Sequence, residues 1–312
     1  MSFRQVVLTL AAAFFALAIG VVLGARLLSD PVVSGLRGDK GDLQELVDKA
    51  AGQNSELNRK LDAADAFDTE MSARIVRDSL AGKSVLLLRT SDAADGDIEA
   101  LSRIIGLAGG TVTGTIALSE EFVAATSAEK LRSVVNSPIV PPGATLNTAL
   151  TDPGAQAGDL LGLTMLKSRA PDAAPVDDAA RDTVLTTLRD TGFITYGEPM
   201  APADTAVVMT GGALPADAGN QGAIVARFAA ALASHGYATV LAGRDGSADG
   251  VSAIAVARSD AALSAAVTTV DDAGIADGRI TTVLALQSLI SGAPPAHYGT
   301  GPGATAVTVA QK

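Results

Sequence analysis

The 312-residue chain contains no cysteine, no tryptophan and only two histidines. The absence of cysteine excludes disulfides, thiolate-ligated zinc or copper, and cysteine nucleophiles. With His235 and His297 as the only imidazoles, histidine-based catalysis has few places to occur, and no catalytic triad or metal-hydrolase motif is visible. We therefore predict a protein that is not an enzyme and carries no cofactor. Aromatic residues make up only 3% of the chain, which predicts a core of small aliphatic side chains.

Positive charge is also in deficit. The chain has 23 Lys and Arg against 34 Asp and Glu, a net charge of −11. Binding to nucleic acid needs a basic face, so this balance argues against a nucleic-acid partner. It equally disfavours adsorption to an anionic membrane surface. The acidic balance indicates a soluble, well-hydrated surface on the globular part.

The amino-terminal segment is the one long apolar run. No charged residue occurs between Arg4 and Arg26, and Val6–Ala25 supplies the ~20 apolar residues needed to cross a bilayer. A cleaved signal peptide is the alternative, but its apolar core usually has ~7–15 residues. Arg26 follows this run directly, and no A-x-A site ends it. We predict a short amino-terminal tail and a single transmembrane helix within residues 1–26, and the charges that flank the helix do not decide its orientation.

Small residues recur every fourth position along this segment, at Ala12, Ala16, Gly20 and Gly24. Such a stripe lets two transmembrane helices approach closely and associate. Gly and Ala are also common in membrane helices in general, which is the alternative explanation. The stripe favours a homodimer only slightly by itself.

Residues 27–80 have the spacing of a coiled-coil stalk. One set of heptad positions is mostly apolar: Leu36, Leu43, Ala50, Leu57, Ala64 and Met71. The other set comprises Lys40, Val47, Asn54, Leu61, Asp68 and Ile75. A single Asn in the seam is a known device for fixing register in a two-stranded coiled coil, and Asn54 occupies such a position. An amphipathic helix packed against its own head is the alternative.

The candidate dimerisation residues join the two segments. They are Ala12, Ala16, Gly20, Gly24, Leu43, Val47, Asn54, Leu57 and Leu61.

Residues 81–312 are predicted to form an α/β head. Apolar runs typical of buried strands occur at Ser84–Thr90, Thr111–Leu118, Phe193–Tyr196, Thr205–Thr210, Ala238–Gly243 and Ser252–Ala257. Helical spacing occurs in the stretch that ends at Ala108, and at Ala180–Asp190, Ala223–Ser234 and Ile280–Ile290. This alternation predicts a mostly parallel, doubly wound sheet, with a possible subdivision near residues 138–178.

Two polar loops in the head are weak candidates for a small-ligand pocket. They follow successive predicted strands and contain Gly211, Gly212, Asn220, Arg244 and Asp245. In open α/β sheets ligands bind outside the carboxyl ends of the strands, and Arg244 would be the partner of an anion. Ordinary turn chemistry, in which Gly supplies positive φ, is the alternative.

Several longer stretches resemble one known family when they are taken together. They are Ser127–Ser137, Ala157–Gly162, Leu188–Tyr196, Thr210–Gly222, Val225–Ala233, Leu241–Ala248, Thr269–Thr281 and His297–Gly301. The chain resembles, over essentially its whole length, the actinobacterial copper-transporter family typified by MctB, also described as the cell-division protein SteB. The resemblance implies an envelope protein whose head lies outside the cytoplasmic membrane. It implies either copper efflux, sometimes as an outer-membrane channel, or an adaptor that regulates a peptidoglycan hydrolase at division with a cytoplasmic partner.

The residues favour the adaptor over copper transport. Copper(I) prefers thiolate and thioether ligands, with imidazole also suitable, and the weak candidates here are Met200, Met209 and His297. Isolated core methionines are the alternative. One transmembrane helix encloses no lumen, and an outer-membrane barrel needs aromatic girdles that this chain cannot supply. We predict a dimeric, single-pass protein of the cytoplasmic membrane, with copper homeostasis and a small-ligand-binding head as the alternatives.

Overall fold

The computed structural model of the chain describes residues 44–170 and 175–310. The chain divides into two compact units, Met1–Ala64 and Asp65–Lys312. Within the described ranges, no helix is both long enough and apolar enough to cross a membrane. The predicted transmembrane helix Val6–Ala25 lies outside those ranges, as does its small-residue stripe.

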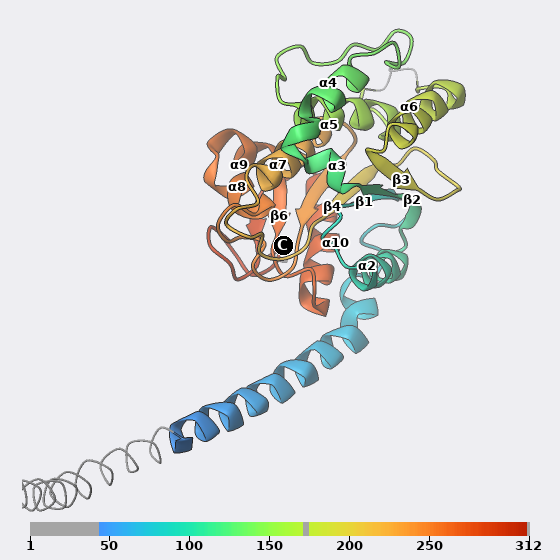
Figure 1. Cartoon of the computed structure of the whole chain (residues 1–312). Helices are drawn as coiled ribbons and strands as arrows, with labels where there is room; N and C mark the ends of the chain where they lie inside the picture. Colours follow the sequence, from blue (N-terminus) through green and yellow to red (C-terminus); the bar gives the residue numbers. More distant parts are fainter. Residues whose placement is uncertain (1–43, 171–174, 311–312) are drawn as a thin grey trace, which may run out of the picture. The chain divides into compact units, whose positions relative to one another are not determined.

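A single helix runs over residues 44–75 (Figure 1). Large apolar side chains are exposed on it, with Leu46 62%, Val47 60%, Leu57 56% and Leu61 66% accessible. Near its carboxyl end the helix becomes partly buried. Ser72, which belongs to the unit that begins at Asp65, is only 1% exposed. The head unit therefore includes the last turns of this helix, upstream of the predicted start at residue 81.

The head is built on a seven-stranded sheet in the order β3-β2-β1-β4-β5-β6-β7. Its strands are β1 (Ser84–Arg89), β2 (Thr111–Leu118), β3 (Ile194–Tyr196), β4 (Thr205–Met209), β5 (Ala238–Ala242), β6 (Thr268–Val270) and β7 (His297–Tyr298). Only β3 pairs antiparallel, with β2, and every other pair is parallel. The predicted α/β class with a mostly parallel sheet is confirmed.

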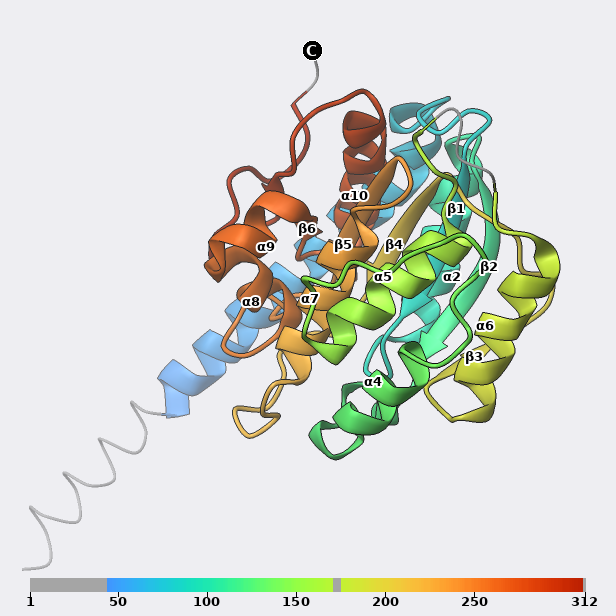
Figure 2. The same ribbon diagram turned by 90° about the horizontal axis from the view of Figure 1, so that it is seen from above.

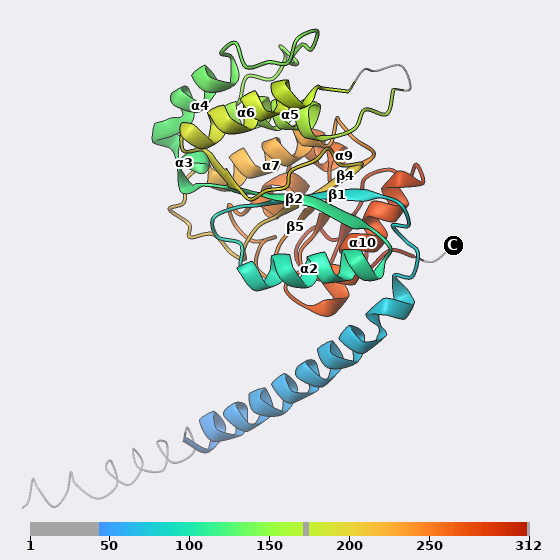
Figure 3. The same ribbon diagram turned by 90° about the vertical axis from the view of Figure 1, so that its right-hand side faces the viewer.

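Helices cover both faces of the sheet (Figure 3). Helix α2 (Asp95–Leu107) and helix α10 (Ala276–Ile290) lie on one face. On the other lie α3 (Glu120–Val123), α4 (Ala128–Val135), α5 (Pro153–Met165), α6 (Asp178–Asp190) and α7 (Gln221–Leu232). Since side chains alternate along a strand, β1 contributes Leu87 to one core and Leu88 to the other. Both faces of β1 are therefore buried, as its continuous apolar run predicts.

Helices α5 and α7 pack side by side over the sheet (Figure 2). A row of glycines on α5 makes this close approach possible. A Cβ on Gly154 would lie 2.6 Å from the carbonyl oxygen of Ile224, and one on Gly158 would lie 2.3 Å from that of Phe228. A Cβ on Gly162 would meet the His235 ring at 2.5 Å. The spacing of four residues places all three glycines on one helix face.

One predicted strand is wrong. Residues Ser252–Ala257 were expected to extend, but Ala253–Ser259 form helix α8, followed by α9 (Ala261–Ala266). A short apolar run fits a buried strand or a buried helix equally well, and alanine favours the helix. Strand β6 then forms further along the chain, at Thr268–Val270. Residues 138–178, where a subdivision was considered, lie within the unit Asp65–Lys312.

Candidate functional site

The topological switch point of the sheet lies between β1 and β4. From β1 the chain first builds β2 and β3 on one side, and then returns to build β4 on the other. Ligands of open α/β sheets bind at the carboxyl ends of the strands that flank such a point. Here Asp92 fills the position, since it accepts hydrogen bonds from the Gly211 amide at 3.1 Å and the Thr210 hydroxyl at 3.4 Å. The remaining cavity is about 40 Å³, which suits a water molecule rather than a metabolite.

The two predicted polar loops do come together beside this point. The Arg244 amide donates to the Gly211 carbonyl at 3.1 Å. A Cβ on Gly212 would lie only 2.8 Å from the carbonyl oxygen of Asp245. The loops after β4 and β5 therefore pack directly against each other and leave little space between them. Asn220 takes part in neither of these two contacts. It is exposed and occupies the N-cap position of α7.

The guanidinium of Arg244 already holds an internal carboxylate. Its Nε lies 2.5 Å from Asp97 Oδ2, and its Nη2 lies 3.1 Å from Asp97 Oδ1. Asp97 is on α2 and its side chain is 6% exposed, while that of Arg244 is 49% exposed. Hydrogen bonding to Asp97 and the charge of that carboxylate raise the pKa of Arg244. The sequence predicts that Arg244 binds the anion of a ligand. In the structure its partner is instead the Asp97 carboxylate of the same chain.

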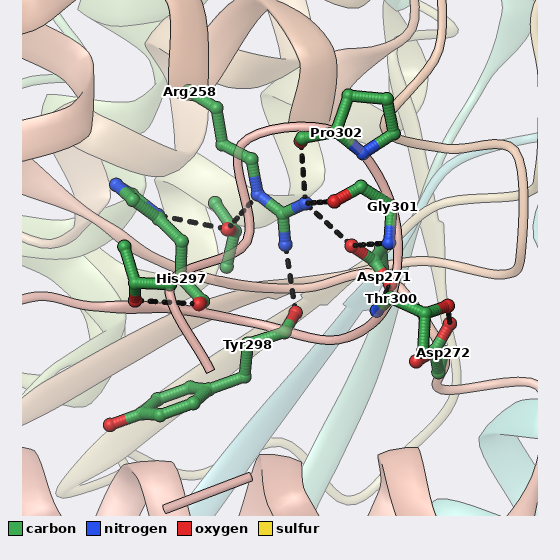
Figure 4. A network of polar contacts seen from close by, with 10 residues as sticks. Arg258, Asp271, Asp272, His297, Tyr298, Thr300, Gly301 and Pro302 are labelled. Carbon is green, nitrogen blue, oxygen red and sulfur yellow. Dashed lines mark hydrogen bonds and ion pairs between the residues drawn. The ribbon is translucent and has the colours of Figure 1, made fainter. Parts of the chain in front are cut away.

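A second polar network lies at the carboxyl end of β6 (Figure 4). Arg258 reaches it from α8 and pairs with Asp271, the residue after the strand. The same guanidinium donates to the Tyr298 carbonyl at 2.7 Å and to the Thr269 hydroxyl at 2.9 Å. The two charged side chains are 3% and 2% exposed, so the pair is buried and extensively hydrogen-bonded.

The carboxyl-terminal segment wraps around Asp271. Its carboxylate accepts hydrogen bonds from the amides of Thr300 at 3.0 Å and Gly301 at 3.1 Å. Gly299 has φ +125°, and a Cβ there would lie 1.9 Å from Asp271 Oδ1. Only glycine permits this approach, which explains Gly299 in the stretch His297–Gly301. Arg258 and Asp271 were not singled out from the sequence, since neither lies in a recognisable motif.

Two further titratable groups lie beside the buried pair. Asp272 is 8% exposed, and burial together with the neighbouring Asp271 carboxylate raises its pKa to about 7. His297 bonds through Nε2 to the Ser264 hydroxyl at 2.6 Å and through Nδ1 to the Thr269 hydroxyl at 3.0 Å. Burial and the nearby Arg258 lower the pKa of His297, which favours a neutral ring. Both of its nitrogens are occupied by hydroxyl groups.

The three metal candidates are not brought together. Met209 is 1% exposed in the central strand β4, and Met200 lies against Gly114 of β2. His297 is in β7, three strands from β4, a separation of about 14 Å at ~4.8 Å per strand. Within residues 44–170 and 175–310, no group of three or more histidines and carboxylates is placed to hold a metal ion.

The candidate dimerisation residues divide between described and undescribed parts of the chain. Val47, Asn54, Leu57 and Leu61 are exposed on the helix over residues 44–75. The others, Ala12, Ala16, Gly20, Gly24 and Leu43, lie outside the described residues.

A cavity that the sequence did not suggest lies at the opposite edge of the sheet. It measures about 770 Å³ and is lined by residues near the amino ends of β1, β4 and β5, among them Lys167, Arg169 and Tyr237. The stretch Lys167–Arg169 was the available signal, since basic residues are scarce in this chain, but it lies in a loop without a recognisable motif.

Comparison with known proteins gives a consistent assignment. Residues 1–309 match the family described as "Copper transport outer membrane protein, MctB". The chain is 55% identical over 312 residues to the "Copper transporter MctB" of Mycobacterium tuberculosis and of Mycobacterium bovis, with 99% of both chains covered. It is 54% identical over 315 residues to the protein of that name from Mycobacterium leprae, again with 99% covered. The family name describes a transport protein and not an enzyme, and the chain belongs to this MctB family.

Proposed function

We propose that this chain acts in copper handling at the cell envelope, as the names of its relatives indicate, and that it does so as a self-associating scaffold. In this proposal the stalk joins two copies of the chain, and the heads present binding surfaces to other components. Copper is the cargo of the system, and a partner carries it. The exposed apolar positions on the helix over residues 44–75 are the observation that carries this proposal.

Four large apolar side chains of that helix, Leu46, Val47, Leu57 and Leu61, are more than half exposed. Full burial of such a side chain contributes about 1.5–3 kcal/mol, so a helix with several of them gains from a partner. Val47, Leu57 and Leu61 fall at seam positions of one heptad register, which favours a second copy of the same helix. Asn54 lies in the same seam and would fix the register of the pair.

The donor groups of the head support a partner that carries copper. Met200, Met209 and His297 lie on separate strands or loops, and both His297 nitrogens bond to hydroxyl groups. Copper(I) favours convergent thioether, thiolate or imidazole ligands. A scaffold needs no such convergence, because its contribution is to position other proteins.

Engineered cysteines test self-association cleanly, since the chain has no cysteine of its own. Asn54→Cys places a thiol in the proposed seam, and Arg59→Cys places one on the outer side of the same register. Disulfides form when the Cα atoms are about 4.4–6.8 Å apart, which seam positions of a parallel pair satisfy and outer positions do not. In membranes treated with a mild oxidant, we expect a covalent dimer from Asn54→Cys and little from Arg59→Cys. Equal cross-linking of both variants would contradict the paired stalk.

The link to copper is tested in cells that lack the endogenous copy of this protein. Wild-type chain should restore growth in copper, and Leu57→Ser combined with Leu61→Ser should not, because the polar pair removes seam burial. Immunoblotting must show equal protein levels. Both proteins carry Asn54→Cys as the cross-linking reporter. Full copper tolerance in cells whose serine variant no longer cross-links would remove self-association from the mechanism.

The proposed topology is a single pass through the cytoplasmic membrane, with the head outside the cytoplasm. The single pass follows from the apolar run Val6–Ala25, and the placement of the head follows from the family resemblance, because the flanking charges do not decide the orientation. Asp245 is exposed on the head and is a suitable position for a labelling cysteine. Asp245→Cys should react with a membrane-impermeant maleimide in intact spheroplasts, whereas a cysteine at Ser2 should react only after lysis.

A second candidate keeps the scaffold and changes its clients. The adaptor of a peptidoglycan hydrolase, working with a membrane-associated cytoplasmic partner, needs the same anchor and stalk. The helix over residues 44–75 is about 48 Å long at 1.5 Å per residue, which suits a component that spans distance. Chained or branched cells in the Leu57→Ser and Leu61→Ser strain, with normal copper tolerance, would favour this candidate over the first.

A further inference from the structure

The cavity at the amino edge of the sheet has the size of a ligand site. Its volume of about 770 Å³ falls within the ~300–1,000 Å³ typical of small-molecule pockets. The segment after α5, the start of α6 and the turn after α7 form its walls, together with the loop Pro141–Ala144. The switch-point cavity, by contrast, holds only about 40 Å³.

One wall of this cavity carries a positive charge that no acid among residues 44–170 and 175–310 neutralises. Arg169 donates through Nη2 to the Tyr237 carbonyl at 2.6 Å and through Nε to the Gly236 carbonyl. Among the described residues it has no carboxylate within ion-pair distance. Lys167, on the same wall, is already paired with Asp204 at 3.2 Å. Two carbonyl groups thus hold the Arg169 guanidinium in place and leave its charge available to an anion.

A second arginine on the cavity wall has an unmet hydrogen bond. Arg181 is 6% exposed, with Nη1 2.6 Å from Asp178 Oδ1 and Nη2 2.9 Å from the Val176 carbonyl. Its buried Nε has no hydrogen-bond partner among the described residues. Since this Nε has almost no accessible surface and the charge is paired with Asp178, Arg181 is a fixed part of the wall and does not itself face a ligand.

The rest of the wall is mixed. Its apolar part includes Leu163, Leu166, Val176 and Pro202, and the polar side chains of Thr164, Ser168, Asp177 and His235 also line the cavity. A purely inorganic anion would leave these side chains in contact with water, while a ligand with an apolar body would cover them. The cavity therefore combines an acid-binding side with a hydrophobic side.

We propose that this cavity binds a small organic anion, whose phosphate or carboxylate contacts Arg169 while its apolar body lies against Leu163 and Leu166. The site is separate from the switch point, from the buried network around Asp271 and from the stalk. It makes the head a ligand-responsive module, whichever client the scaffold serves.

Binding is tested with 1-naphthyl phosphate on the full chain in lipid nanodiscs, by calorimetry with empty nanodiscs as the reference. Two probes separate the parts of the ligand, since 1-naphthol lacks the charge and inorganic phosphate lacks the apolar body. 1-Naphthoate replaces phosphate by carboxylate. We expect saturable binding of 1-naphthyl phosphate or 1-naphthoate at least about tenfold tighter than that of either truncated probe, because each lacks one half of the contacts.

Variants locate the site. Arg169→Gln should raise the Kd about tenfold or more, because it removes the free charge. Arg189→Gln is the matched control, since Arg189 lies at the far end of α6 and does not line the cavity. Its Kd should stay within about twofold of wild type.

Three outcomes would overturn the proposal. They are no saturable binding of either naphthyl acid, equal affinity of 1-naphthol and 1-naphthyl phosphate, or an Arg169→Gln variant that binds like wild type.

Discussion

Arg258 and Asp271 form an ion pair whose side chains are only 3% and 2% exposed, and the pair joins α8 to the end of β6. The Asp271 carboxylate also accepts from the amides of Thr300 and Gly301. One buried pair thus holds together three segments, namely α8, the end of β6 and the carboxyl-terminal segment that contains Thr300 and Gly301. A buried pair of this kind is weak support for high stability, because desolvating the charges offsets their attraction. Removing only one of the two charges, by contrast, leaves the other charge buried without a counter-ion and is strongly destabilising.

Arg258→Met should destabilise the head by about 3–5 kcal/mol, because it leaves the Asp271 carboxylate buried without its counter-ion. Thermal denaturation of the full chain in detergent, followed by circular dichroism, measures the loss. Arg189→Met is the control, since the side chain of that arginine is 45% exposed and contacts only Asp190 at 3.6 Å and the Tyr196 ring at 5.0 Å among the described residues. Such surface pairs contribute at most about 1 kcal/mol. If both variants melted alike, the buried pair would not be what holds the carboxyl-terminal segment.

Asp272 gives the free energy of unfolding a pH dependence of defined sign. Its folded pKa of about 7 is above the ordinary value of 3.8, because of burial and of the Asp271 charge, with Asp277 adding to it. The folded state therefore binds more protons between these two values, so this group's contribution to stability falls as pH rises from about 4 to about 7. Above pH 7 the unfavourable contribution is complete.

Asp272→Asn removes this contribution. The test compares urea denaturation of wild type and variant at pH 5 and pH 8. We expect the variant to gain stability relative to wild type at pH 8 compared with pH 5. Asp159 and Asp204, whose pKa values are lowered, are common to both proteins and cancel in the comparison. A difference between the proteins that is independent of pH would show that Asp272 titrates normally.

The close packing of α5 on α7 predicts opposite effects for two Gly→Ala substitutions. At Gly158 a Cβ would lie 2.3 Å from the Phe228 carbonyl oxygen, so Gly158→Ala should force the helices apart and cost about 1–3 kcal/mol. Gly106 of α2 has open space around it, and Gly106→Ala should stabilise by up to about 1 kcal/mol through the backbone entropy of glycine. Melting temperatures of the two variants should move in opposite directions. A stable Gly158→Ala protein would mean that α7 has room to shift.

The centre of the sheet was predictable because its strands are buried on both faces. Ser84–Arg89 is a continuous apolar run and forms a strand at the expected place. Thr111–Leu118 is only partly buried and also forms a strand at the expected place. The run Ser252–Ala257 is likewise apolar, but it forms a helix. Six residues are too few to distinguish the period of a helix from that of a strand. Strand β6, with only Thr268–Val270, was too short to stand out.

The site was less predictable, since its chemistry depends on pairs that only the fold creates. Gly211 and Arg244 do meet, as two adjacent carboxyl ends require, but Asp97 fills the position that an external anion would need. Sequence spacing gives no sign that Asp97 and Arg244 are partners, 147 residues apart. The same holds for Arg169, whose significance comes from the carbonyl groups beyond α7 that hold it.

The proposed stalk makes one further prediction at Asn54. A polar Asn in the seam of a coiled coil lowers its stability while it fixes register, so Asn54→Val should strengthen the pair. Chemical cross-linking of the full chain at decreasing concentrations in detergent measures this, and dimer should persist to lower concentration in the variant. Gln53→Val is the matched control, one residue outside the seam, and should change the dimer little. If both substitutions strengthened association equally, the gain would come from added apolar surface, and Asn54 would not lie between the two helices.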